Sequence, residues 1–81
     1  MDASPKVYPN PTSSTLTFEC KGLEGGAYDI QIFDMLGRIV FKESFSSIPP
    51  EFKLNVSKWA KGVYTYIIMG VKEYNGKIIV E

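Results

Sequence analysis

Apolar and polar residues alternate through several stretches of this 81-residue chain. In residues 15–20, 28–32 and 52–56, apolar side chains occupy every second position and polar or charged side chains lie between them. A period of two residues is typical of a strand that buries one face. The pattern therefore predicts three half-buried strands.

The longest run of strand-forming residues spans positions 62–68. Its apolar side chains fall on both faces, which predicts a central strand with a neighbour on each side. Gly62 stands at its start, where a positive φ or a close backbone approach is expected. Trp59 is expected to fold back and cover the end of the core.

Prolines and glycines shape two segments in the first half of the chain. Residues 7–12 carry two prolines around Asn10, which predicts a rigid, extended leading segment at a sheet edge. Asp34 followed by Gly37 predicts a tight turn, with the carboxylate accepting hydrogen bonds from nearby amides. Residues 38–45 would then return as the second arm of a hairpin.

The second half contains two further connections and one predicted irregularity within a strand. Residues 57–61 are expected to form a tight connection with up to one helical turn. Met69-Gly70 is predicted to be a two-residue hairpin turn leading into a last strand at 71–80. Asn75-Gly76 is predicted to be a bulge within that strand.

Seven extended segments at a spacing of about ten residues, without helical periodicity, predict an all-β fold. The expected architecture is a seven-stranded antiparallel immunoglobulin-like β-sandwich, with a barrel of similar strand number as the alternative. The length fits one domain. Residues 7–81 are expected to form it, and residues 1–6 to be a linker or residues foreign to the domain.

Charge and cysteine content narrow the classes of partner. Nine basic and nine acidic side chains cancel and are scattered along the chain, which argues against nucleic-acid or anionic-membrane binding. No apolar run approaches the ~18 to 20 residues of a membrane span, so direct membrane insertion is not expected. Cys20 is the only cysteine and is expected to be a small buried hydrophobe.

The chain offers little for catalysis. It has no histidine, which removes Ser-His and Cys-His pairs and the commonest transition-metal ligand. Asp29 and Asp34 are interpreted as a solvated strand residue and a turn cap, and the remaining acids are too dispersed to predict a calcium site. We therefore expect no enzyme activity, no catalytic residue, no metal and no cofactor.

Aromatic side chains supply one binding hypothesis. A platform for sugar rings would draw on Trp59, Tyr28, Tyr64, Tyr66 and Tyr74. A domain of this size needs most of these rings for its core, and Tyr74 is expected to be the most exposed. A fibronectin-like spacer or carbohydrate-binding appendage of a secreted enzyme is the alternative function.

Four blocks of sequence, in this order, resemble the C-terminal sorting domain of the type IX (Por) secretion system. They are Tyr8-Pro9-Asn10-Pro11, Ile30-x-Ile32-Phe33-Asp34-x-x-Gly37-Arg38-x-Val40, Trp59-x-x-Gly62-Val63-Tyr64 and Gly76-Lys77-Ile78-Ile79-Val80. Each block alone is common, but four in order over residues 7–81 are specific. Two positions depart from the family: Trp59 replaces a more usual aliphatic residue, and Thr65 is small and polar.

The resemblance implies a non-enzymatic secretion and sorting signal at the C-terminus of a cargo protein of a Gram-negative bacterium. The cargo would pass through the periplasm to the cell surface or the medium. The implied partners are the outer-membrane translocon, an upstream cargo domain in the same chain, and a sortase-like cysteine peptidase. That peptidase would cut near residues 2–6 or upstream.

The resemblance also assigns roles to residues. Candidates for recognition by the translocon are Lys77, Ile78, Ile79, Val80 and Glu81, which are equally explained as a packed strand with a solvated lysine. The other motif positions are expected to determine the fold: Tyr8, Pro9, Asn10, Pro11, Asp34, Gly37, Arg38, Trp59, Gly62 and Tyr64. Edge strands would allow a weak homodimer through strand addition.

Overall fold

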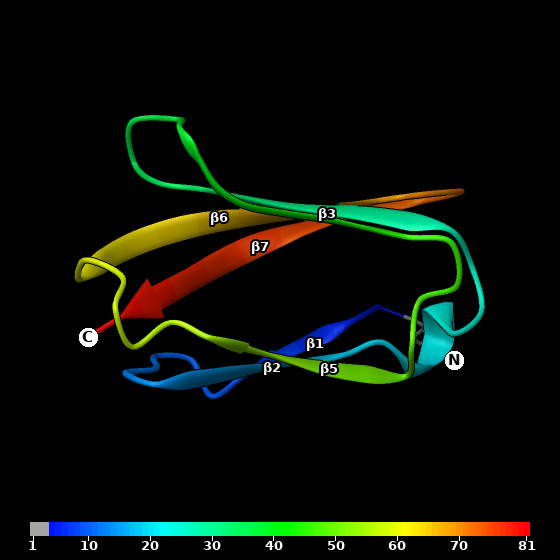
Figure 1. Ribbon diagram of the computed structural model, residues 1–81, viewed down its shortest axis with the longest axis horizontal. Coiled ribbons are helices and arrows are strands. Elements are labelled where there is room, and N and C mark those ends of the chain that lie inside the picture. The colour runs from blue at the N-terminus through cyan, green and yellow to red at the C-terminus, as the bar shows by residue number, and fades with distance from the viewer. Residues whose placement is uncertain (1–3) are drawn as a thin grey trace.

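Two antiparallel sheets pack face to face in the computed structural model, which describes residues 4–81 (Figure 1). One sheet has the order β1-β2-β5, formed by Lys6–Tyr8, Thr15–Glu19 and Glu51–Asn55. The other has the order β4-β3-β6-β7, formed by Ile39–Phe45, Tyr28–Phe33, Gly62–Met69 and Glu73–Val80. The predicted seven-stranded sandwich is confirmed, and the separate sheets exclude the barrel.

Strand β6 is the central strand that the sequence predicted. It lies between β3 and β7, with Tyr64, Tyr66 and Ile68 buried against the other sheet. Gly62 at its start has a φ of +152°. The ring of Trp59 packs on that of Tyr64, with centroids 5.1 Å apart, and covers the edge of the core as expected.

Phe18 joins the two sheets at the centre of the core. Its fully buried ring stacks on Phe52 at 4.7 Å and meets Tyr66 of the opposite sheet edge to face at 5.8 Å. Burying one side chain of this size contributes about 1.5 to 3 kcal/mol. Cys20 is also fully buried, and burial raises the pKa of its thiol to about 11, with Glu19 adding to the effect. It is a core residue, as predicted.

The predicted two-residue turn at Met69-Gly70 is wrong. Met69 pairs with Glu73 at the end of the ladder, so the loop has three residues, Gly70, Val71 and Lys72. Gly70 is required by a distant contact, because a Cβ there would collide with the ring of Tyr28.

The predicted bulge at Asn75-Gly76 is also wrong. The β6–β7 ladder runs in register through both residues, with Gly76 opposite Tyr66. The Tyr66 ring lies over the glycine, where a Cβ would come within 2.6 Å of its hydroxyl oxygen. The glycine is therefore explained by the aromatic ring that packs over it, and the strand needs no bulge at this position. The register shift lies instead in the β3–β4 ladder, between Ile32 and Phe33.

Residues 57–61 contain turns and no helical turn. The Asn55 side chain starts the connection, since its Oδ1 accepts hydrogen bonds from the amide and the hydroxyl of Ser57 at 2.9 and 2.7 Å. In the described chain the one helical element is a 3-10 turn at Lys21–Leu23, within the predicted glycine-rich loop.

The domain boundary stays a prediction. Of the residues 1–6 that were expected to precede the domain, Lys6 is the first residue of β1. Residues 1–3, and with them part of the expected cleavage region, lie outside the described residues.

Candidate functional site

The four motif blocks meet at one end of the sandwich, on the left in Figure 1. The β3–β4 turn at 34–38 lies beside the β5–β6 connection at 60–64, and the two line one pocket. The start of β6 pairs with the end of β7, and Thr12 forms a bridge with Val80. We call this region the motif end.

Asn10 holds the free edge of β7. Its Nδ2 donates a hydrogen bond to the Lys77 carbonyl oxygen at 2.8 Å, and its Oδ1 accepts one from the Ile79 amide at 2.9 Å. One side-chain amide thus pairs with the backbone of β7 as a neighbouring strand would.

Thr12 continues the same pairing. Its amide donates to the Ile79 carbonyl at 2.9 Å, and its carbonyl accepts from the Glu81 amide at 2.9 Å. Asn10 and Thr12 together form what we call the edge clamp. Pro9 and Pro11 flank Asn10 without adding amide donors, and both peptide bonds that precede them are cis.

The candidate recognition residues alternate between the buried and the exposed side of β7. Ile78 and Val80 point into the core, with 0% and 4% of their surface exposed. Lys77, Ile79 and Glu81 are exposed. Because their backbone edge is occupied by the clamp, these three present mainly their side chains to a partner. Their recognition role stays a prediction.

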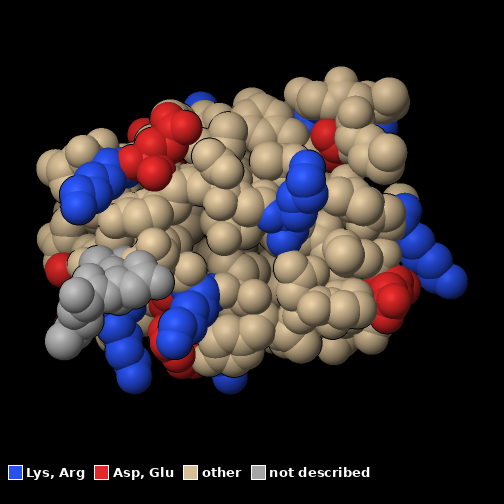
Figure 2. Space-filling view, turned by 180° about the vertical axis from the view of Figure 1, so that it is seen from behind, with Lys and Arg blue, Asp and Glu red and all other residues tan. Residues whose placement is uncertain are grey.

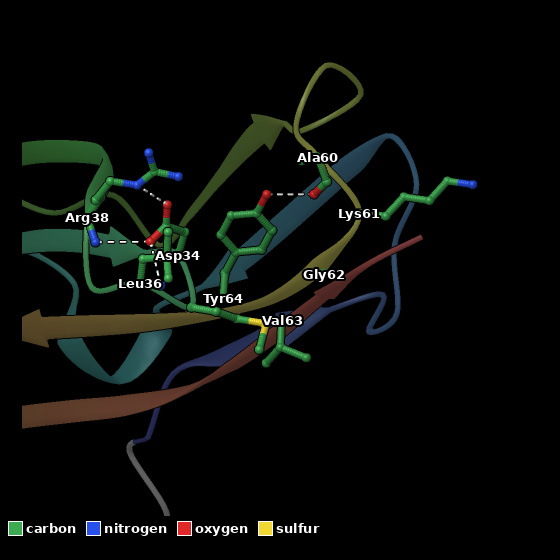
Figure 3. Close-up of a pocket in the computed structure, with 9 residues that line it drawn as sticks. Asp34, Leu36, Arg38, Ala60, Lys61, Gly62, Val63 and Tyr64 are labelled. Atoms are coloured by element: carbon green, nitrogen blue, oxygen red, sulfur yellow. Dashed lines mark hydrogen bonds and ion pairs between the residues drawn. The ribbon is translucent and has the colours of Figure 1, made fainter.

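Asp34 organises the β3–β4 turn, as its spacing from Gly37 predicted (Figure 3). Its Oδ1 accepts hydrogen bonds from the amides of Leu36 and Arg38 at 2.9 and 3.0 Å, and its Oδ2 accepts from Arg38 Nε at 2.8 Å. Gly37 supplies the left-handed conformation with a φ of +83°. The Arg38 amide first, then the Arg38 side chain and the Leu36 amide, lower the pKa of the Asp34 carboxyl.

Tyr64 fixes the β5–β6 connection beside this turn (Figure 3). Its hydroxyl donates to the Ala60 carbonyl at 2.6 Å, while its ring supports Trp59. These contacts support a structural role for the third motif block.

Tyr8 is the most exposed tyrosine of the motif blocks, at 42%. Its hydroxyl donates a long hydrogen bond of 3.4 Å to Glu19 Oε2. Desolvation, then the charges of Glu19 and Glu51, raise the pKa of its phenol. Tyr8 is the last residue of β1.

The five rings proposed as a sugar platform belong to the core. Tyr28, Tyr64 and Tyr66 are buried, and Trp59 and Tyr74 are partly buried against the core cluster. Tyr74, expected to be the most exposed of the five, pairs with Ile68 and shares its inward face. The structure therefore gives no support to stacking of sugars on these residues.

The face of the molecule shown in Figure 2 carries mixed charge without a dominant patch. Basic and acidic side chains are scattered over the face shown in Figure 2. Within residues 4–81 there is no group of three or more residues suited to hold a metal. The same residues contain no helix long and apolar enough to cross a membrane.

A groove on the outward face of β3, β6 and β7 was missed by the sequence analysis. It has a volume of about 750 Å³. Its lining residues are Phe33, Asp34, Met35, Gly37, Val63, Thr65, Ile67 and Lys77. The sequence feature that could have revealed the groove was the apolar character of both faces of residues 62–68. That feature was interpreted as the sign of a strand covered by other parts of the chain.

By class the chain is a seven-stranded antiparallel β-sandwich whose polar motif residues serve turns and a strand edge. The chain belongs to the family of secretion system C-terminal sorting domains, because the sequence model of that family matches residues 6–81. A search of curated proteins gave no match.

Among solved structures, the chain is similar to PorZ, described as an essential bacterial surface component of the type IX secretion system of Porphyromonas gingivalis. The TM-score is 0.76 at 26% sequence identity. The alignment covers 95% of this chain and 11% of that chain, so this chain spans about a tenth of its length. The predicted membership of the type IX sorting family is confirmed.

Proposed function

We propose that this chain is the C-terminal signal that directs a cargo protein through the outer-membrane type IX translocon to the cell surface or the medium. The observation that carries the proposal is the family match over residues 6–81. The meeting of all four motif blocks at one end of the sandwich supports it. The domain acts as the substrate of the export machinery and performs no catalysis.

The arrangement of the two ends supports this role. The described chain starts at the end of the sandwich opposite the motif end (Figure 1). An upstream cargo domain would therefore join the far side and leave the motif end open to the translocon. A sortase-like cysteine peptidase would release the domain by cutting near residues 2–6 or upstream of them.

The test is a reporter that carries a periplasmic signal peptide, with residues 1–81 fused at its C-terminus. In a bacterium with the type IX machinery, the fusion should reach the surface or the medium, and the reporter without residues 6–81 should stay in the periplasm. In a Gram-negative host that lacks the machinery, both should stay in the periplasm. Equal distribution of the two reporters in the type IX host would overturn the proposal.

A further inference from the structure

The edge clamp limits how a partner can contact the end of β7. Strand addition needs free amides and carbonyls along a sheet edge. On β7 four groups along this edge bond to Asn10 and Thr12: the Lys77 carbonyl, the Ile79 amide and carbonyl, and the Glu81 amide. A partner that contacts the last residues therefore has to use their side chains.

The outward side chains of β7 continue an apolar face. Ile79 lies opposite Val63, and Lys77 lies opposite Thr65. Ile79 and Val63 are 42% and 36% exposed. Phe33 pairs with Thr65 from the other side and belongs to the groove. The last strand and the groove thus form one continuous surface.

Lys77 is the free charge of this surface. Its ammonium group makes no ion pair or hydrogen bond with any described residue. Asp34, the carboxylate that lines the same groove, is engaged by the Arg38 side chain and two amides. An apolar groove with one uncompensated positive charge is complementary to apolar side chains grouped around one carboxylate.

We propose that the groove and the outward side chains of Lys77 and Ile79 form the docking surface for a protein partner that presents such a carboxylate. The inference rests on the proposed function and makes this partner a component of the export machinery. It would read the C-terminal strand through its outward face, with Lys77 pairing to the carboxylate and Ile79 packing beside it. Strand addition at residues 77–81 takes no part.

The chain offers a matched control on the same sheet face. Lys42 is exposed on β4 and lies opposite Gln31, two residues before Phe33 on β3. It carries the same charge as Lys77 but does not line the groove. The Asn10 hydrogen bonds go to the backbone of Lys77 and Ile79, so substitution of either side chain leaves the clamp in place.

The experiment compares export of the reporter fusion carrying Lys77→Glu, Lys77→Arg, Ile79→Thr or Lys42→Glu. Lys77→Glu should reduce the exported fraction about fivefold or more, since it places like charges together. Ile79→Thr should reduce it less, and Lys77→Arg and Lys42→Glu should export as the unsubstituted fusion does. Thermal unfolding of each chain checks that the variants fold equally well.

The outcomes separate the two proposals. If the unsubstituted fusion is not exported, the proposed function fails and the docking surface fails with it. If it is exported and folded Lys77→Glu and Ile79→Thr fusions are exported equally well, the docking surface alone is overturned. Equal loss with Lys42→Glu would also overturn it, because a general charge effect would then explain the result.

Discussion

Asn10 connects the first motif block to the last. A side-chain amide carries both a donor and an acceptor, and Asn10 uses them on the carbonyl of Lys77 and the amide of Ile79. Aspartate would keep the acceptor and lose the donor, and alanine would lose both. The residue type is therefore determined by the strand edge that it covers.

Asn10→Ala should lower the free energy of unfolding by about 1 to 2 kcal/mol, since two largely exposed hydrogen bonds are lost. Asn10→Asp should also destabilise, because a carboxylate would face the Lys77 carbonyl. Urea denaturation of the purified chain measures both. Asn75→Ala, on the exposed side of the same strand, is the control and should change little. A cost at Asn75 equal to that at Asn10 would refute the clamp.

Asp34 gives the fold a dependence on pH. Hydrogen bonds from the Arg38 amide, the Arg38 side chain and the Leu36 amide lower its pKa from the ordinary 3.8. A carboxyl with a lowered pKa stabilises the folded state above its ordinary pKa, and that stability is lost as the pH falls through the lowered value. The Tm difference between the chain and Asp34→Asn should therefore be largest near about pH 7 and shrink toward about pH 2. Asp29→Asn is the control, and a difference that does not vary with pH would contradict this account.

At the scale of elements, β7 combines three functions in one strand. Its residues Ile78 and Val80 fill the core, its odd-numbered residues face outward, and its backbone edge is held by the clamp. Deleting residues 77–81 would remove two core side chains, each worth about 1.5 to 3 kcal/mol, from a fold with roughly 5 to 15 kcal/mol of stability. Loss of export after that deletion would report unfolding. Substitution of single outward side chains is the sharper test of recognition.

The edge strands also differ in their availability. With the end of β7 clamped, β4 is the open edge of the four-stranded sheet. It is where the weak self-association expected from the sequence would occur. Lys42 and Glu43 on this strand are the kind of charged residues that discourage edge pairing.

Gly76→Ala should destabilise the chain by about 1 to 3 kcal/mol, because the new methyl group would overlap the Tyr66 ring. In the Tyr66→Val background the same substitution should cost much less, since the ring is absent. A double-mutant cycle by chemical denaturation measures this coupling. Equal costs in both backgrounds would show that the glycine serves the backbone and not the ring.

The strands and the turn at Asp34 were predictable from the sequence, but the roles of Gly70 and Gly76 were not. Alternation of Leu16 with Phe18, or of Ile30 with Ile32, is a local signal, and each of these residues is buried as expected. Gly70 and Gly76 are needed because the rings of Tyr28 and Tyr66 lie over them. These contacts depend on how distant strands pack, so the local pattern resembled a turn and a bulge.

The contacts among the motif residues were only partly predictable from the sequence. The turn at Asp34 and Gly37 is local and formed as predicted. The bond between Asn10 and the Lys77 carbonyl joins residues 67 positions apart, and no local pattern reports such a contact. The outward groove was missed for a related reason, because an apolar face can be covered or exposed and the sequence of β6 does not distinguish them.

The whole molecule has properties that suit a sorting signal: it is small and carries no net charge. It measures 32 × 22 × 20 Å and has a formal net charge of zero. The polar side chains of its motif residues form hydrogen bonds within turns and along one strand edge. Its distinctive sequence is gathered at one end, opposite the start of the described chain (Figure 1). Export of this chain by the type IX translocon is the central claim.

The most direct measurement is the fraction of a reporter fused to residues 1–81 that lies outside the outer membrane, in two isogenic strains with and without the type IX translocon. The account predicts export in the first strain and retention in the periplasm in the second, for the folded chain. Export that is equal in both strains, or retention in both, would contradict it.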